Sequence, residues 1–314
     1  MFRSGVDEAN KAWRFYEHLT LLHSYEVLQK QAIDAYSPYK DIVERYSKTS
    51  GRNIHPVTYE HLEKHPEVAE QNVALLKNAM ELWRMASQTS VAVAPILYHY
   101  SWHCFNSFFI YTFFRWEPQH SRSHGIRAPP KDNIEDVKIQ FLKRKDGLFQ
   151  RLIDTWILLG ASLAFSPFLP VYKENEINFV PNDRYLVSNS NEISLKQLMN
   201  FNSANFEKEL YSNLKERPLS PSFLINSAYL PTNTIKSYLV VFAASNLARY
   251  RPILWNSILI GKTREQSNFA LNWRIALFDY TIGSNSDPGL LYQISRLLKA
   301  VRIGQFYFKR VGLV

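Results

Sequence analysis

Residues 85–114 read MASQTSVAVAPILYHYSWHCFNSFFIYTFF and contain no Asp, Glu, Lys or Arg. The run is long enough to cross a bilayer as a helix. It also contains His99, His103, Asn106 and Pro95, and polar side chains of this kind are costly in hydrocarbon unless they are paired inside protein. We therefore expect a buried central helix over residues 88–115, with no insertion into a membrane.

The composition is that of a folded protein. Of the 314 residues, 46% are hydrophobic and 21% are charged, a balance that excludes a disordered chain. The single cysteine, Cys104, excludes an internal disulfide framework and is typical of a reducing cytoplasm. The first residues carry charges and no apolar stretch of signal length. We therefore expect a cytoplasmic protein.

Helical periodicity on both sides of the central run predicts a mainly α fold with bundle-like N- and C-terminal halves. We expect an N-terminal helical region over residues 1–172, a polar connecting region over 173–220 and a C-terminal helical region over 221–314. A small β element is predicted from a strand near 137–141 and a hairpin near 177–188, in which INFV and YLVS pair. Thr58, Pro66 and Ser194 are expected at helix starts.

Several segments carry a resemblance to a known family. They are WRFYEHLTLLHSYEVLQK, APILYHYSWHCFNSFF followed by the His124-Gly125 pair, KRKDGLFQRLID, ISLKQLM and SNLARYRPILWNSIL. In this order they resemble the YaaC-like family of bacterial proteins over most of the chain. The resemblance implies a mostly helical, cytoplasmic bacterial protein. It implies no particular activity and assigns no functional residue.

The formal charge of +9 favours polyanionic partners such as nucleic acid. The basic side chains expected to contact phosphates form two clusters, Arg122, Arg127, Lys143, Arg144 and Lys145 in the first and Arg296, Lys299, Arg302, Lys309 and Arg310 in the second. If the clusters converge, they form one electropositive surface that positions a nucleic acid without reading its sequence. The alternative is a solvated rim with no partner.

Arg115 and His120 have the Arg-x4-His spacing of HEPN-type ribonucleases, which are helical and metal-independent. In that chemistry the histidine transfers protons during attack by the 2′-hydroxyl, and the arginine neutralises charge on the phosphoryl oxygens. His124 is a candidate second proton-transfer residue. Trp116 and Pro118 depart from the usual polar, helical version of the motif. The alternative is an arginine and a histidine that cover the last carbonyls of a helix.

All nine histidines precede residue 125, so a histidine-based site must lie in, or be completed by, the N-terminal half. His99 and His103 are four residues apart and share a helix face, as two metal ligands would. No acidic residue stands between them, and two buried, hydrogen-bonded histidines explain the pair equally well. We therefore expect neither a metal nor another cofactor.

Arg249 stands in an otherwise apolar segment, so we expect it to pair with a buried carboxylate, either Asp154 or Asp279. Three functions remain open from the sequence. The first is a nucleic-acid or polyanion-binding component with a basic surface, the second a metal-independent ribonuclease, and the third a scaffold that engages a protein partner, such as an acidic one. The sequence leaves the oligomeric state open.

Overall fold

The computed structural model describes residues 2–37, 40–116, 123–142, 147–159, 168–173, 176–181, 192–200, 235, 238–261, 263, 266 and 267. Within these residues the chain is mainly helical and carries only small antiparallel sheets, which confirms the predicted fold class. The second basic cluster, residues 296–310, lies outside the described residues, as do Arg122 and residues 143–145 of the first.

The helices are Phe2–Leu19 (α1), Leu22–Tyr36 (α2), Lys40–Ser50 (α3), Tyr59–Lys64 (α4), Glu67–Gln88 (α5), Ala94–Phe113 (α6), Leu148–Leu158 (α7), Leu195–Asn200 (α8) and Pro252–Ile260 (α11). Residues 238–250 form a further helical segment, and Ile134–Asp136 (η2) is a 3-10 turn. Among the described helices, none is both long and apolar enough to span a membrane.

The central helix is shorter than the predicted range of 88–115. Gln88 ends α5, residues 89–93 form a turn, and α6 begins at Ala94 with Pro95 in its first turn. Proline suits this position because the first amides of a helix need no partner within it. At its other end α6 stops at Phe113, and the next three residues form a strand.

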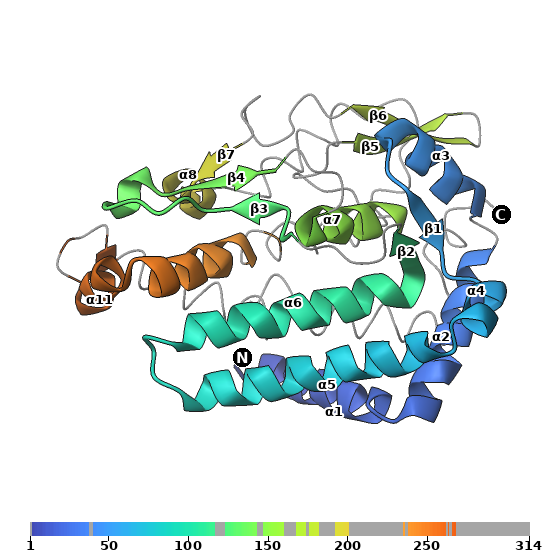
Figure 1. Cartoon of the computed structure of the whole chain (residues 1–314), viewed down its shortest axis with the longest axis horizontal. Helices are drawn as coiled ribbons and strands as arrows, with labels where there is room; N and C mark the ends of the chain where they lie inside the picture. Colours follow the sequence, from blue (N-terminus) through green and yellow to red (C-terminus); the bar gives the residue numbers. More distant parts are fainter. Residues whose placement is uncertain are drawn as a thin grey trace.

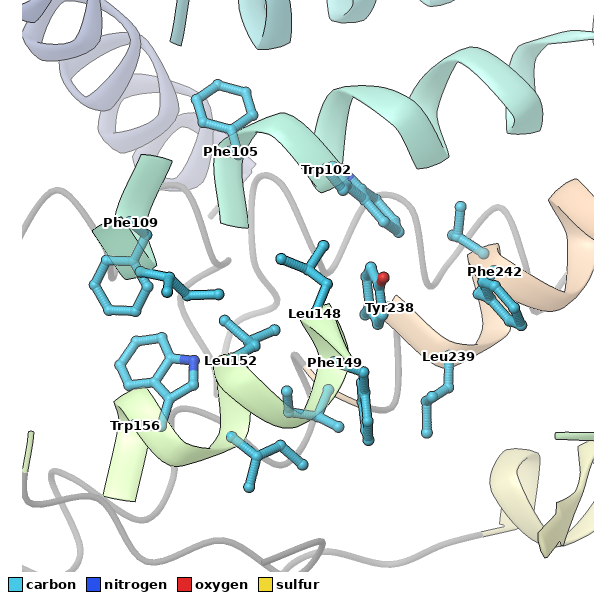
Figure 2. Close-up of a cluster of buried hydrophobic side chains, with 14 of the residues drawn as sticks. Trp102, Phe105, Phe109, Leu148, Phe149, Leu152, Trp156, Tyr238, Leu239 and Phe242 are labelled. Atoms are coloured by element: carbon cyan, nitrogen blue, oxygen red, sulfur yellow. The ribbon is translucent and has the colours of Figure 1, made fainter. Parts of the chain in front are cut away.

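Helix α6 forms the centre of the core. It lies antiparallel to α5, with α2 and α7 packed against it as well (Figure 1). Its side chains are buried on nearly every face, as expected of a helix without a polar stripe. Trp102, Phe105 and Phe109 of α6 meet Leu148, Leu152 and Trp156 of α7, while Tyr238 and Phe242 of segment 238–250 complete the cluster (Figure 2).

The described residues also form three small antiparallel sheets. Ile54–Pro56 (β1) pairs with Phe114–Trp116 (β2), Lys138–Phe141 (β4) lies between Ile126–Arg127 (β3) and Glu192–Ser194 (β7), and Phe168–Lys173 (β5) pairs with Glu176–Pro181 (β6). The strand predicted near 137–141 is therefore confirmed as β4.

The structure describes only the first strand of the hairpin predicted near 177–188. The INFV segment lies in β6, but it pairs with the preceding β5, with Tyr172 opposite Ile177. Only two residues separate these strands, and such a short connection favours hairpin closure. The YLVS segment lies outside the described residues.

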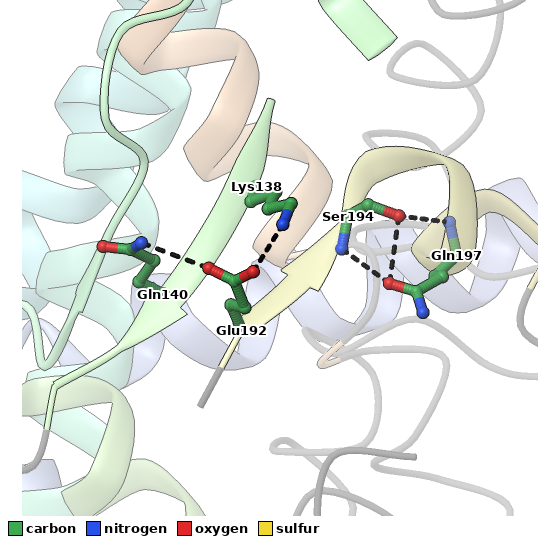
Figure 3. Close-up of polar contacts among 5 residues, drawn as sticks. All are labelled: Lys138, Gln140, Glu192, Ser194 and Gln197. Atoms are coloured by element: carbon green, nitrogen blue, oxygen red, sulfur yellow. Dashed lines mark hydrogen bonds and ion pairs between the residues drawn. The ribbon is translucent and has the colours of Figure 1, made fainter. Parts of the chain in front are cut away.

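Two predicted helix starts are confirmed by their hydrogen bonds. The backbone N–H of His61 donates to Thr58 Oγ1 (3.2 Å) at the start of α4. At the start of α8, Gln197 N–H donates to Ser194 Oγ (3.1 Å) and Ser194 N–H donates to Gln197 Oε1 (2.9 Å), forming a capping box (Figure 3). Pro66 directly precedes α5, as expected.

Candidate functional site

A pocket of about 410 Å³ lies between α5 and α6, where these helices meet the β1–β2 pair. On each helix the lining residues recur at three- or four-residue intervals, so one face of each helix forms a wall. The lining side chains come from α5 (Val68, Gln71, Asn72, Ala74, Leu75, Asn78), from α6 (His103, Ser107, Tyr111), from β2 (Phe114, Arg115, Trp116), and from Val57, His61 and Leu148.

The chemistry of this lining is cationic, aromatic and amide-rich. Among the described residues that line the pocket, none is an aspartate or glutamate, and Arg115 is the only lysine or arginine. The lining also includes amide and hydroxyl groups and the aromatic rings of β2 and Tyr111. Pockets with mostly apolar walls and a few convergent polar groups are typical of small-molecule sites, and this volume is within their usual range. The arrangement suits an anion that also carries a flat or apolar part.

Arg115 lies in a strand, and not at the end of a helix as predicted. It pairs with His55 of β1, while its neighbours Phe114 and Trp116 are buried and Arg115 is half-buried. The strand is extended because its backbone pairs with β1, which holds the guanidinium at the pocket wall. His120, its predicted catalytic partner, lies outside the described residues.

A second arginine, Arg151 of α7, supports the aromatic wall from behind. Its side chain is fully buried, its Nη1 donates to Tyr111 Oη (3.1 Å), and its guanidinium lies 5.4 Å from the centre of the Trp116 ring. A cation over an indole face is stabilised by the ring quadrupole. Sequence reasoning missed Arg151, although a lone arginine in the apolar run LFQRLID is a detectable signal of a buried, partnered charge.

One turn further along α7, Asp154 forms a buried ion pair with Arg52. Arg52 Nε lies 3.1 Å from Asp154 Oδ2, and Tyr46 donates to Asp154 Oδ1 (2.6 Å). Burial raises the pKa of Asp154 to about 6, against the lowering effects of Arg52 and Tyr46. The network ties α3 and the connection between α3 and β1 to α7.

Arg249 is not the partner of Asp154, contrary to one of the two predicted pairings. Its Nη1 donates to Tyr100 Oη (2.8 Å), and its guanidinium lies 5.5 Å and 5.0 Å from the ring centres of Tyr100 and Tyr250. Among the described residues, aromatic faces stabilise this cation. Asp279, the other predicted partner, lies outside the described residues.

Three histidines form a cluster that begins at the pocket. The His103 ring lies 5.2 Å from the His124 ring, which lies 5.1 Å from the His99 ring. Burial, and then the neighbouring histidine His124, lower the pKa of His103 to about 4. Burial is also the main cause of the lowered pKa of His99 and His124, and Arg249 contributes to both. All three imidazoles are therefore neutral at pH 7.

The histidine cluster is not a metal centre in the part of the chain that the structure describes. No group of three or more His, Cys, Asp or Glu there is arranged to hold an ion. Both ring nitrogens of His99, and Nδ1 of His103 and of His124, lack a hydrogen-bond partner among the described residues. His99 and His103 do share a face of α6, as predicted, and the structure adds His124 to them.

Two glycines place His124 against α6. Gly125 has a φ of 76°, a left-handed backbone conformation that glycine adopts more easily than other residues. Its backbone also contacts the backbone of Gly147 at the start of α7. The N–H groups of Leu148 and Phe149 donate to the carbonyls of Ser123 and His124 (3.0 Å each). The first turn of α7 thereby finds partners and fixes the segment that carries His124.

The structure brings together only part of the predicted site. Arg115 lines the pocket, and His124 lies behind it in contact with His103, outside the lining itself. Arg127 is exposed on β3, where its Nε donates to Gln140 Oε1 (2.7 Å). His61 had not been singled out from the sequence, and His103 had been considered only with His99 as a possible pair of metal ligands. The spacing of His103 with Ser107 and Tyr111 on one helix face was the available signal.

Comparisons with family models, with curated proteins and with solved structures give no match to this chain. The resemblance to the YaaC-like family accordingly stays a prediction from the segments quoted above.

Proposed function

We propose that this protein binds a nucleotide, either free or as one unit of a nucleic-acid strand, in the pocket between α5 and α6. The observation that carries the proposal is the position of Arg115 in an aromatic pocket whose described lining includes no acidic residue. A guanidinium binds phosphate oxygens through charge-assisted, often bidentate hydrogen bonds. The phosphate therefore lies at Arg115.

The remainder of the pocket suits the base and the sugar. Trp116 and Tyr111 offer rings near the arginine, and base–aromatic stacking contributes about 1–3 kcal/mol per base. The amides of Gln71 and Asn78 and the hydroxyl of Ser107 can bond to base or sugar edges. The formal charge of +9 supports the same partner class, because net positive charge accelerates encounters with polyanions. The exposed Arg127 on β3 is a candidate for further phosphate contacts along a strand.

Replacing Arg115 tests the phosphate contact. Titration of a fluorescein-labelled oligoribonucleotide, read by anisotropy at several salt concentrations, should show affinity for the wild type that falls with salt. Arg115→Gln should weaken binding about tenfold or more, because a hydrogen bond to a charged group contributes about 1.5–3 kcal/mol. It should also reduce the salt slope by about one. Arg84→Gln, an exposed arginine on α5 paired with Glu81, is the control and should bind normally. Equal affinities for the wild type and Arg115→Gln would contradict the proposal.

Two glutamine-to-glutamate substitutions on the same helix provide a second test that leaves Arg115 in place. Gln71 is exposed at the pocket, whereas Gln88 is exposed at the end of the same helix. Gln71→Glu should weaken binding of the oligoribonucleotide several-fold, because it adds an anion beside the phosphate site. Gln88→Glu makes the same chemical change away from the pocket and should have little effect. Similar losses for both variants would mean that the ligand binds elsewhere.

A further inference from the structure

We propose that this pocket also cleaves RNA without a metal ion, with His103 as the general base, His61 as the general acid and Arg115 at the phosphate. The inference rests on the proposed nucleotide binding, to which it adds a reaction. Its basis is that two imidazoles from separate elements, α4 and α6, line the same pocket as a guanidinium. Both histidines are distinct from His120, the partner that the Arg-x4-His spacing predicts for Arg115.

Cleavage of RNA by its own 2′-hydroxyl requires two proton transfers and one cation. The 2′-oxygen attacks the adjacent phosphorus while the bond from phosphorus to the 5′-oxygen breaks. His103 accepts the proton from the 2′-hydroxyl, and His61 donates a proton to the departing 5′-oxygen, which takes the electron pair of the broken bond. Arg115 neutralises the charge that grows on the phosphoryl oxygens. The products are a 2′,3′-cyclic phosphate and a 5′-hydroxyl, so the step needs neither metal nor water.

The surroundings of the two histidines assign their roles. Burial, and then the neighbouring His124, lower the pKa of His103, so its ring is neutral at pH 7 and able to accept a proton. Arg249 is the charged group that bears on the cluster, since it contributes to the lowered pKa of both His99 and His124. A bound phosphate, being an anion, would stabilise the protonated form of His103. His61, the other imidazole of the lining, is buried on α4 and is left as the proton donor.

The experiment is incubation of the full-length protein with an end-labelled oligoribonucleotide in EDTA, with the fragments and their end groups resolved on a gel. The wild type should yield fragments with a 2′,3′-cyclic phosphate, and a 2′-O-methyl strand of the same sequence should stay intact because it lacks the attacking hydroxyl. His103→Gln and His61→Gln should each slow cleavage by roughly a hundredfold or more. The affinity of His103→Gln for the 2′-O-methyl strand should stay within a few-fold of the wild-type value, because the His103 ring is neutral at pH 7 and Arg115 carries the phosphate-binding charge. His23→Gln, an exposed histidine on α2, is the control.

The outcomes separate this proposal from the binding proposal. If the wild type binds the RNA and leaves it intact, cleavage is overturned while nucleotide binding stands. If RNA is neither bound nor cleaved, both proposals fall. Cleavage that persists in His103→Gln and His61→Gln, or that is lost only in His120→Gln, overturns the assignment of the acid–base pair. Cleavage of the 2′-O-methyl strand overturns the reaction itself. A bell-shaped pH profile that loses its acidic limb in His103→Gln would support the assigned base.

Discussion

Asp154 is a fully buried carboxylate held between Arg52 and Tyr46. Taking a carboxylate out of water costs several kcal/mol, and the ion pair with Arg52 and the hydrogen bond from Tyr46 offset that cost. The raised pKa of Asp154 means that desolvation outweighs these partners. The ion pair therefore contributes little net stability, but removing either residue leaves the other as an unpaired buried charge, which is strongly destabilising.

Arg52→Met should destabilise the fold by about 3–5 kcal/mol at pH 7, because it leaves the buried Asp154 carboxylate without its cation. The double variant Arg52→Met/Asp154→Leu should recover most of this loss, since neither charge is then buried. Urea denaturation at pH 7 measures both values, with Arg84→Gln as an exposed-arginine control that should change stability by less than about 1 kcal/mol. A loss for Arg52→Met no larger than that of the control would show that the pair is not required.

Helix α7 owes its position to a backbone contact between two glycines. A Cβ atom at Gly147 would overlap the backbone of Gly125, lying only 2.6 Å from its nitrogen. Gly147 itself has φ of −69°, so any residue could adopt its conformation, and the requirement for glycine is one of space alone. The contact couples the segment carrying His124 to the helix that carries Arg151 and Asp154.

Gly147→Ala should cost about 2–4 kcal/mol, because backbone atoms must move apart to accommodate one methyl group. The same displacement should weaken oligonucleotide binding, since Leu148 lines the pocket and Arg151 holds Tyr111 in its wall. Thermal and urea unfolding measure the stability. Lys77→Ala, a substitution at an exposed position on α5, is the control and should change the free energy of unfolding by less than about 0.5 kcal/mol. Full stability of Gly147→Ala would mean that the two segments are not in contact.

Across the whole molecule, two buried groups respond to acid in opposite directions. Lowering the pKa of His103 from 6.5 to about 4 corresponds to at most about 3 kcal/mol of stability, present above pH 6.5 and lost as the pH falls to 4. The raised pKa of Asp154, from 3.8 to about 6, affects stability in the opposite direction and by a similar maximum amount. Below pH 6 the folded protein binds a proton at Asp154 more readily than the unfolded chain does, so acidification increases stability at this residue. His99 and His124 act in the same direction as His103, and the histidines therefore outweigh the single carboxylate.

The free energy of unfolding should consequently fall by about 2 kcal/mol when the pH is lowered from 7 to 5. In this range the histidines bind protons in the unfolded chain but, because their pKa values are lowered, bind fewer in the folded protein. Denaturant titrations at pH 7, 6 and 5 measure the change. His99→Phe removes one imidazole while keeping a ring in the core, and it should flatten this dependence. His23→Gln should leave the dependence unchanged. Stability that rises on acidification would show that Asp154, and not the histidine cluster, controls the response.

Short-range patterns specified most of the helices and their starts. Thr58 and Ser194 cap helices through bonds to groups three residues away, and β4 alternates buried and exposed side chains. Such signals depend only on neighbouring residues, so they can be read before the chain folds. The apolar run of residues 85–114 likewise predicted a buried helix because burial follows from its lack of charge.

Long-range packing decided the strands and the site. Phe114–Trp116 is extended because β1, far earlier in the chain, pairs with it, and β6 pairs with β5 because the shorter connection closes more easily. Spacing drew attention to Arg115 but pointed to His120 as its partner. The pocket places Arg115 with His61 and His103, from α4 and α6. No local pattern encodes that grouping, because it results from the packing of α5 on α6 and from the pairing of β1 with β2.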